Sequence, residues 1–141
     1  DSIHLHSEAP GPSEWHDDAR GARWDSLRRV RQVVTSALET ARNDGAIGAS
    51  LQAAPTVHVS PEIAAHFDGE DAAMLFITSD AQISVEPAPE DAFRIEGVED
   101  AAVVFALAAG GKCERCWKIM PEVTGDTDIC RRCFEVVNAT A

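Results

Sequence analysis

Cys113-Glu114-Arg115-Cys116 and Cys130-Arg131-Arg132-Cys133 are the two stretches that decide the fold of the C-terminal part of this chain. Thirteen residues separate the two pairs, so the four cysteines fall within 21 consecutive residues. Two CxxC pairs at this spacing are typical of a metal site, because each tight turn presents two sulfurs to one ion. Four thiolates fill the coordination sphere of zinc, so the predicted site is structural and keeps no position for a catalytic water.

Disulfide bonding and thiol redox chemistry are the alternatives for these cysteines. A redox motif normally needs one CxxC pair beside a βαβ pattern, and two pairs in one short segment fit a metal site better. The sequence has no apolar run long enough to span a bilayer and no secretory signal pattern at its start. Reduced thiols suit the cytoplasm. We therefore expect one structural Zn²⁺, a cytoplasmic location and no membrane partner.

A long amphipathic helix is predicted from about Ala19 to Asn43. Apolar residues recur there at helical spacing and cover about half of the circumference. They are Trp24, Leu27, Val30, Val33, Val34, Ala37, Leu38 and Ala41. Arg28 and Arg29 fall outside this apolar arc. Gly45 is suited to the left-handed conformation that ends a helix.

Short strands and helices are predicted in the middle of the chain. Strands are expected at residues 56–59, 73–78, 82–85 and 98–109, and a short helix at 61–67. Residues 1–6 are expected to be extended and residues 9–13 to form a loop. We assign no chemistry to four histidines, which lack a neighbouring nucleophile or ligand cluster: His4, His6, His58 and His66.

These elements predict an α+β fold with a long helix, a small mixed αβ subdomain and a C-terminal zinc ribbon held by the four cysteines. We expect three parts, namely residues 1–50 with the long helix, residues 51–109 as the subdomain and residues 110–141 as the ribbon. The chain begins at Asp1 rather than Met, and we expect a piece of a longer protein.

Charge is distributed unevenly along the chain, whose formal net charge is −12. Six of the twelve basic residues lie between Arg20 and Arg42, and residues 62–100 hold eleven acidic residues against one arginine. Five more basic residues belong to the cysteine segment: Lys112, Arg115, Lys118, Arg131 and Arg132. Because charges more than roughly 10 Å apart are largely screened at 0.1 M salt, a local basic cluster could bind RNA despite the net charge. Ordinary solvated surface explains the two clusters equally well.

Sequence signatures of common catalytic sites are missing. GxGxxG, GxxxxGK[ST], HExxH and GxSxG do not occur, which gives no support to dinucleotide binding, P-loop chemistry, metalloproteolysis or hydrolase catalysis. Acidic neighbours such as Glu70-Asp71 and Glu99-Asp100 are better explained as solvated surface. We therefore expect no catalytic residue in this chain.

Three stretches of the C-terminal segment follow one another in a specific order: Lys112-Cys113-Glu114-Arg115-Cys116-Trp117-Lys118, Glu122-Val123-Thr124-Gly125 and Ile129-Cys130-Arg131-Arg132-Cys133. They resemble the C-terminal zinc finger of bacterial isoleucyl-tRNA synthetases. The opening Asp1–Leu5, the helix from Trp24 to Arg42 and the turn Ile47–Ala53 resemble the segments that precede this finger in the same family. Gln52 departs from the family, which usually has Glu at that place, and the loop between the cysteine pairs is shorter than in some members.

The resemblance implies a part of an isoleucine–tRNA ligase whose residues 1–50 continue the anticodon-binding region. It implies tRNA(Ile) and the remainder of the synthetase chain as partners, and we expect a monomer. ATP would bind only in a catalytic domain outside this chain, because the His-Ile-Gly-His and Lys-Met-Ser-Lys-Ser signatures do not occur here. Candidate tRNA contacts are Lys112, Arg115, Trp117, Lys118, Arg131 and Arg132, with Arg28 and Arg29 as a second surface.

Two alternatives remain for the ribbon. It would serve as a structural zinc module that docks on the synthetase body or on another protein without touching RNA, or it would bind DNA in the manner of a glycosylase finger. The N-terminal catalytic proline of such glycosylases does not occur here. Trp117 has two interpretations, since its ring either stacks on an unpaired base or covers the turn at Cys116.

Overall fold

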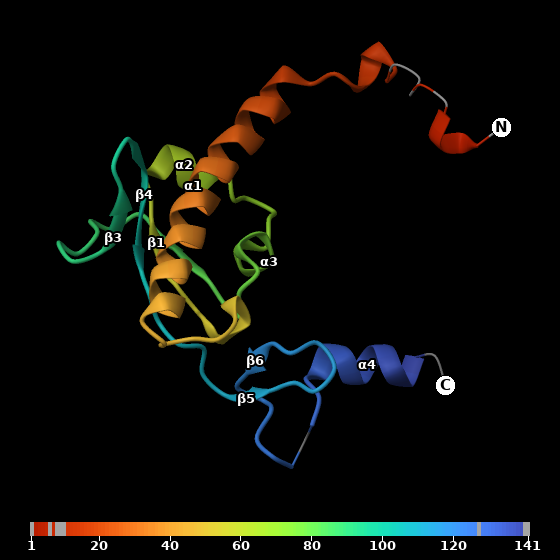
Figure 1. The fold of residues 1–141 in the computed structure, drawn as a ribbon, viewed down its shortest axis with the longest axis vertical. Coiled ribbons are helices and arrows are strands. Elements are labelled where there is room, and N and C mark those ends of the chain that lie inside the picture. Colours follow the sequence, from red (N-terminus) through yellow and green to blue (C-terminus); the bar gives the residue numbers. More distant parts are fainter. Residues whose placement is uncertain (1, 6, 8–10, 127, 140–141) are drawn as a thin grey trace.

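A mixed four-stranded sheet covered by one long helix forms the body of the molecule, and a small ribbon with a short helix follows it (Figure 1). The computed structural model describes residues 2–5, 7, 11–126 and 128–139. The predicted α+β class, with a cluster of four cysteines near the C-terminal end, is confirmed. Among the described residues, no helix combines the length and the apolarity that a bilayer crossing requires.

The long helix α1 spans Asp18–Asn43, close to the predicted range. Its first turn is capped by the Asp17 side chain, which accepts a hydrogen bond from the Arg20 N–H at 2.9 Å. At its end Gly45 adopts φ 74°, and the Ala46 N–H bonds back to the Ala41 carbonyl at 2.9 Å. This is a Schellman ending, which requires the left-handed conformation that glycine adopts without strain.

The sheet has the strand order β2-β1-β4-β3. The strands are β1 (Thr56–His58), β2 (Gln82–Ser84), β3 (Phe93–Ile95) and β4 (Val98–Val104). Strand β1 pairs in parallel with β2, while β4 runs antiparallel to both β1 and β3. The apolar stripe of α1 packs on this sheet, so that Val30, Val33 and Val34 are fully buried with Val57 and Val103 in one core.

The predicted strand at residues 73–78 is wrong. Ala72–Phe76 form the short helix α3, which begins where the Asp71 side chain accepts a hydrogen bond from the Met74 N–H at 3.0 Å. Helix α2 (Pro61–Ala65) confirms the predicted short helix. The strand predicted at 98–109 ends earlier, at Val104, and continues only as an isolated bridge between Leu107 and Ala53.

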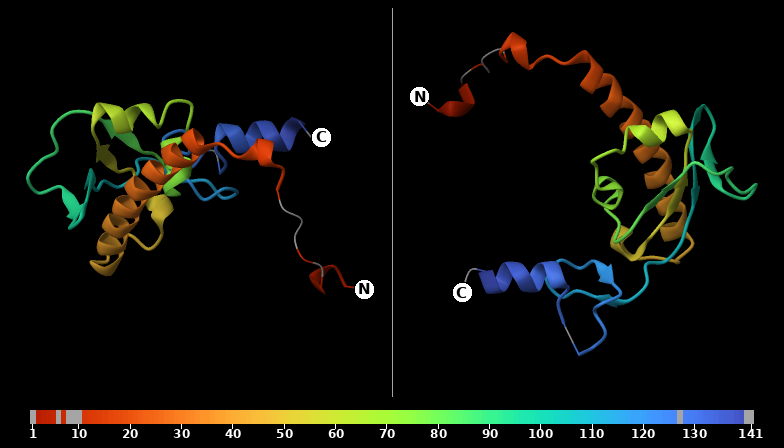
Figure 2. Two further views of the ribbon diagram at one scale, coloured as in Figure 1. Left: turned by 90° about the horizontal axis from the view of Figure 1, so that it is seen from above. Right: turned by 180° about the vertical axis from the view of Figure 1, so that it is seen from behind.

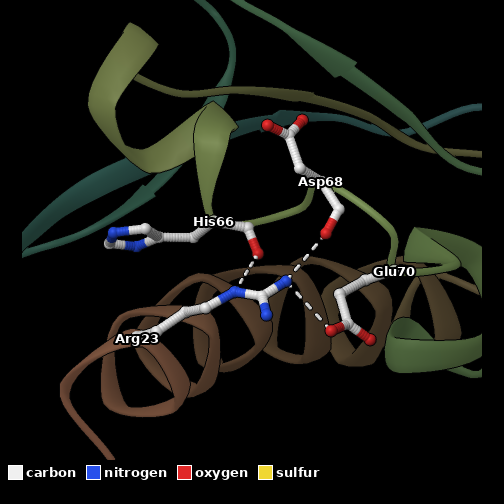
Figure 3. Close-up of polar contacts among 4 residues, drawn as sticks. All are labelled: Arg23, His66, Asp68 and Glu70. Carbon is white, nitrogen blue, oxygen red and sulfur yellow. Dashed lines mark hydrogen bonds and ion pairs between the residues drawn. The ribbon is translucent and has the colours of Figure 1, made fainter. Parts of the chain in front are cut away.

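Arg23 of α1 fastens the segment between α2 and α3 to the long helix, as Figure 3 shows. Its Nε donates to the His66 carbonyl at 2.8 Å, and its Nη2 donates to the Asp68 carbonyl and to Glu70 Oε1, both at 2.9 Å. A planar guanidinium with several donors suits this arrangement. Arg23 is therefore engaged within the body.

The chain leaves the body through Gly110-Gly111 and enters the ribbon. There β5 (Gly111–Lys112) and β6 (Ile119–Met120) form an antiparallel hairpin, and α4 (Arg131–Ala139) follows. A Cβ at Gly110, whose φ is +112°, would lie 2.1 Å from the Met120 carbonyl oxygen, and one at Gly111 would lie 2.3 Å from that of Val123. Both glycines are thus required by close backbone approach.

The first residues differ from the prediction. Ile3–Leu5 and Ser13–Trp15 form 3-10 helices instead of an extended segment and a loop, beyond the N-terminal end of α1 (Figures 1 and 2). His6 and part of the predicted loop, residues 9 and 10, lie outside the described residues. The division into residues 1–50, 51–109 and 110–141 stays a prediction, and α1 and the sheet share one core.

Candidate metal centre and the surface around it

The four cysteines converge at one point of the ribbon. Cys113 and Cys116 lie on the turn between β5 and β6, whereas Cys130 precedes α4 and Cys133 lies in its first turn. Their sulfurs all lie within 4.8 Å of one another, and the Sγ atoms of Cys116 and Cys130 are 3.8 Å apart. A tetrahedral ion with metal–sulfur bonds of about 2.3 Å has sulfur–sulfur edges of about 3.8 Å. None of the four is in a disulfide, and the quartet is positioned to hold one tetrahedral ion.

Backbone hydrogen bonds set the two turns. The Trp117 N–H donates to the Cys113 carbonyl and the Phe134 N–H to the Cys130 carbonyl, each at 2.9 Å. The Cys130 N–H donates to Cys113 Sγ at 3.3 Å and so links the two pairs directly. Hydrogen bonds of this kind orient metal ligands. Val123 is buried among the cysteines and shields them from water.

The thiols lie in different electrostatic environments. Burial alone would raise the pKa of Cys113, but hydrogen bonds from the backbone of Cys116, Cys130 and Arg115 lower this pKa to about 6. Burial raises the pKa of Cys130 to about 11. The Arg115 side chain lowers the pKa of the Cys133 thiol. A bound dication would favour the thiolate form of all four, because a coordinating thiol is deprotonated.

Two arginines of the ribbon face the sulfurs. Arg115 Nη1 lies 3.7 Å from Cys133 Sγ, and a hydrogen bond to the Cys116 side chain raises the pKa of Arg132. Four thiolates around a dication carry a net charge of −2, and nearby guanidinium groups offset it. Arg115 and Arg132, predicted as RNA contacts, thus also lie beside the metal centre.

Trp117 lies on the outside of the ribbon with 61% of its surface exposed. The described buried cluster around the cysteines contains Val123, Met120 and Ile129, and Trp117 is not a member. The Trp117 backbone adopts φ 66°, in the left-handed region that bulky residues rarely occupy. The Lys112 ammonium lies 5.6 Å from the centre of its ring, which is within the range of a cation–π contact.

The arginines of α1 each contact another group of the body, and most of these contacts lie at the surface. Arg28 pairs with Asp25 at 2.7 Å and Arg29 with Asp100 at 2.9 Å. Arg20 pairs with Asp17, and Arg23 bonds to the segment after α2. Arg31 donates to the Leu75 carbonyl, and Arg42 pairs with Glu39. In the ribbon, by contrast, no described carboxylate pairs with Lys112, Arg115, Lys118 or Arg132. Arg131 makes only a long, exposed pair with Glu135 at 3.8 Å.

Ser79 connects the body to the ribbon, and Gln52 holds the turn beside it; no sequence pattern indicated the role of Ser79. Ser79 Oγ accepts a hydrogen bond from the Ile119 N–H at 2.6 Å and donates to the Leu51 carbonyl at 2.5 Å. Gln52 Oε1 accepts from the N–H groups of Gly48 and Ala49 at 2.6 and 3.0 Å. A Glu at this position would offer the same acceptor, so Gln52 preserves the turn.

Comparisons with known proteins agree on one class of relatives. The isoleucine–tRNA ligase of Gluconobacter oxydans (strain 621H) is 43% identical over 142 residues, which cover 99% of this chain and 14% of that protein. That of Ruegeria pomeroyi is 43% identical over 94% of the chain, and that of Agrobacterium fabrum is 41% identical over 89% of it. The chain thus spans 13–14% of the length of these relatives. No protein-family model matches it.

Proposed function

This chain is homologous to one segment of isoleucine–tRNA ligases, and we propose that it is a zinc-containing, tRNA-binding part of such an enzyme. It would help to hold tRNA(Ile) while other domains carry out the ATP-dependent aminoacylation. We assign no catalytic residue to this chain, and ATP would bind in the domains that carry the reaction. A monomer in the cytoplasm, where thiols stay reduced, is part of this proposal.

Zinc is the metal that we propose for the cysteine quartet. Four sulfur donors at tetrahedral spacing suit zinc, and a fully coordinated ion is structural. The buried cluster of the ribbon is small, with four cysteines at its centre. The free energy of metal binding would therefore supply most of the folding free energy of this part.

The pairing of the basic residues is the observation that carries the RNA-binding role. Arg28 and Arg29 are held by Asp25 and Asp100, so binding a phosphate there would first break an ion pair. Lys112 and Lys118 have no described carboxylate partner, and the exposed ring of Trp117 lies between them in the sequence. Cations for phosphates beside an aromatic face for a base are typical of single-stranded RNA recognition.

Paired double variants test this proposal. We expect Lys112→Ala with Lys118→Ala to weaken tRNA(Ile) binding and to reduce the slope of log affinity against log salt by about 1 to 2, because each phosphate contact contributes about one unit. Arg28→Ala with Arg29→Ala removes the same charge from the body and should leave both quantities nearly unchanged. An equal loss of tRNA(Ile) affinity in the two double variants would contradict the proposed surface.

Docking on another part of the parent enzyme is the second candidate, and one observation favours it. Helix α4 exposes apolar side chains, of which Phe134 is 58% exposed and Val136 and Val137 are nearly half exposed. Apolar contacts do not release counterions. Binding of a synthetase body that persists at high salt and weakens with Phe134→Ser would support this role.

A further inference from the structure

The two cysteine turns of the ribbon share one feature besides their cysteines. In Cys113-Glu114-Arg115-Cys116 and in Cys130-Arg131-Arg132-Cys133, an arginine stands directly before the second cysteine. The first turn lies between β5 and β6, and the second leads into α4 (Figure 1). Arg115 and Arg132 therefore occupy equivalent positions in two separate elements that meet at the metal centre.

Each of these two arginines reaches the turn that does not contain it. Arg115 Nη1 lies 3.7 Å from the Sγ atom of Cys133, the second cysteine of the other turn. The Arg132 side chain in return forms a hydrogen bond with Cys116, the second cysteine of the first turn. The contacts are thus reciprocal and link the two turns in both directions.

The first cysteine of each turn has backbone donors instead. The Cys130 N–H donates to Cys113 Sγ at 3.3 Å, and the backbone of Cys116 and of Arg115 also forms hydrogen bonds with this sulfur. The Cys130 sulfur accepts a hydrogen bond from the backbone of Cys133. In both turns, therefore, the backbone holds the first cysteine, whereas the second is held by an arginine of the other turn.

Charge balance explains why cations are suited to these places. Four thiolates around a dication leave a net charge of −2, and two guanidinium groups bring the local charge to zero. Cys113 and Cys133 are fully buried, so water screens this charge poorly. A hydrogen bond from a charged donor is also roughly twice as strong as one between neutral groups.

Arg131 provides a contrast within the second turn. It directly precedes Arg132 in the sequence, yet its described partner is Glu135 of α4, at 3.8 Å, and both side chains of this pair are largely exposed. The same charge at a neighbouring position is thus directed to a carboxylate of the surface and not to a sulfur.

We propose that Arg115 and Arg132 are positioning residues of the metal centre, which hold the second cysteine of the opposite turn and together balance the charge of the four thiolates. The proposal assigns both arginines to the metal and leaves Lys112 and Lys118 as the cations for phosphates. It rests on the metal that we propose for the quartet, and it adds the side chains on which retention of the ion depends.

Neutral variants of the arginines test the inference on the whole chain. Arg115→Gln and Arg132→Gln remove the charge but keep a polar side chain with hydrogen-bond donors, and Arg131→Gln is the matched control. The zinc affinity of each variant is measured by competition with a chromophoric chelator. Samples loaded with Co²⁺ report, through their sulfur-to-metal charge-transfer absorption, whether four thiolates still bind the ion.

We expect Arg115→Gln and Arg132→Gln to bind zinc about tenfold or more weakly than Arg131→Gln, as for other groups that orient metal ligands, with unchanged cobalt absorption. Lysine at either position keeps the charge without the planar fork, so it should recover part of the loss. Cys116 is the one partly exposed cysteine of the quartet. Iodoacetamide should therefore modify Cys116 faster in Arg132→Gln than in the control, because the thiolate has lost its donor.

Three results would count against the inference. Equal zinc affinity in the two glutamine variants and the control would overturn it and leave the proposed metal intact. Equal weakening by lysine and by glutamine at both positions would assign the effect to packing and overturn the role of charge. No zinc binding by the native chain would overturn both the proposed metal and this inference.

Discussion

At the scale of single residues, Gly110 is the glycine of the ribbon where an added side chain meets the closest contact. Its φ is +112°, and a Cβ added there would lie only 2.1 Å from the Met120 carbonyl oxygen, so no side chain fits unless the backbone moves. Gly21, in the exposed part of α1, has nothing within 4 Å of the same position. A side chain is therefore excluded at Gly110 and has room at Gly21, although the sequence alone does not distinguish the two positions.

Replacing each glycine by alanine tests this difference. We expect Gly110→Ala to cost about 2 kcal/mol or more of ribbon stability, because the clash is with backbone, and so to weaken zinc binding measured against a chromophoric chelator. Gly21→Ala should instead stabilise the body by up to about 1 kcal/mol, since alanine favours the helix. Equal zinc affinities in the two variants would show that the close approach at Gly110 is unimportant.

At the scale of elements, the ribbon and the body have separate cores. The core of the body joins α1 to the sheet through residues such as Val30, Val57 and Val103, whereas that of the ribbon consists of the cysteines and Val123. The ribbon hairpin has only two residues in each strand, and a lone hairpin of this size is unstable in water. We infer that the metal stabilises the ribbon and not the body.

Removal of the metal tests this independence. With a chelator, the amides of Cys113 and Cys130 should lose their protection from hydrogen exchange, because their partners belong to the ribbon. The amides of Val57 and Val103 should keep theirs. Simultaneous loss of protection in both parts would contradict separate cores and indicate one cooperative unit.

The elements that the sequence predicted well are those with a long pattern or a distinct ending. Helix α1 has a 26-residue amphipathic pattern and a glycine after its end, which few alternatives satisfy. Residues 73–78 are too short and too apolar for periodicity to separate a strand from a helix, and the Asp71 cap favours the helix. The four cysteines were predictable from spacing, but the Ser79 contact was not, because it joins residues distant in sequence.

At the scale of the whole molecule, the pairing of charges matters more than their number. The net charge of −12 would repel RNA if it were spread evenly. The body instead pairs the arginines of α1 with groups of its own, whereas Lys112 and Lys118 of the ribbon have no described carboxylate partner. We therefore expect the RNA-binding surface to require an intact ribbon.

The most direct measurement of the central claim is the affinity of this chain for tRNA(Ile), with and without its zinc, over a range of salt concentrations. The account predicts one zinc per chain, binding that weakens steeply as salt rises, and loss of binding when a chelator removes the metal. Affinity for tRNA(Ile) that is unchanged after the zinc is removed would contradict this account. So would a zinc-containing chain that does not bind tRNA(Ile) even at low salt.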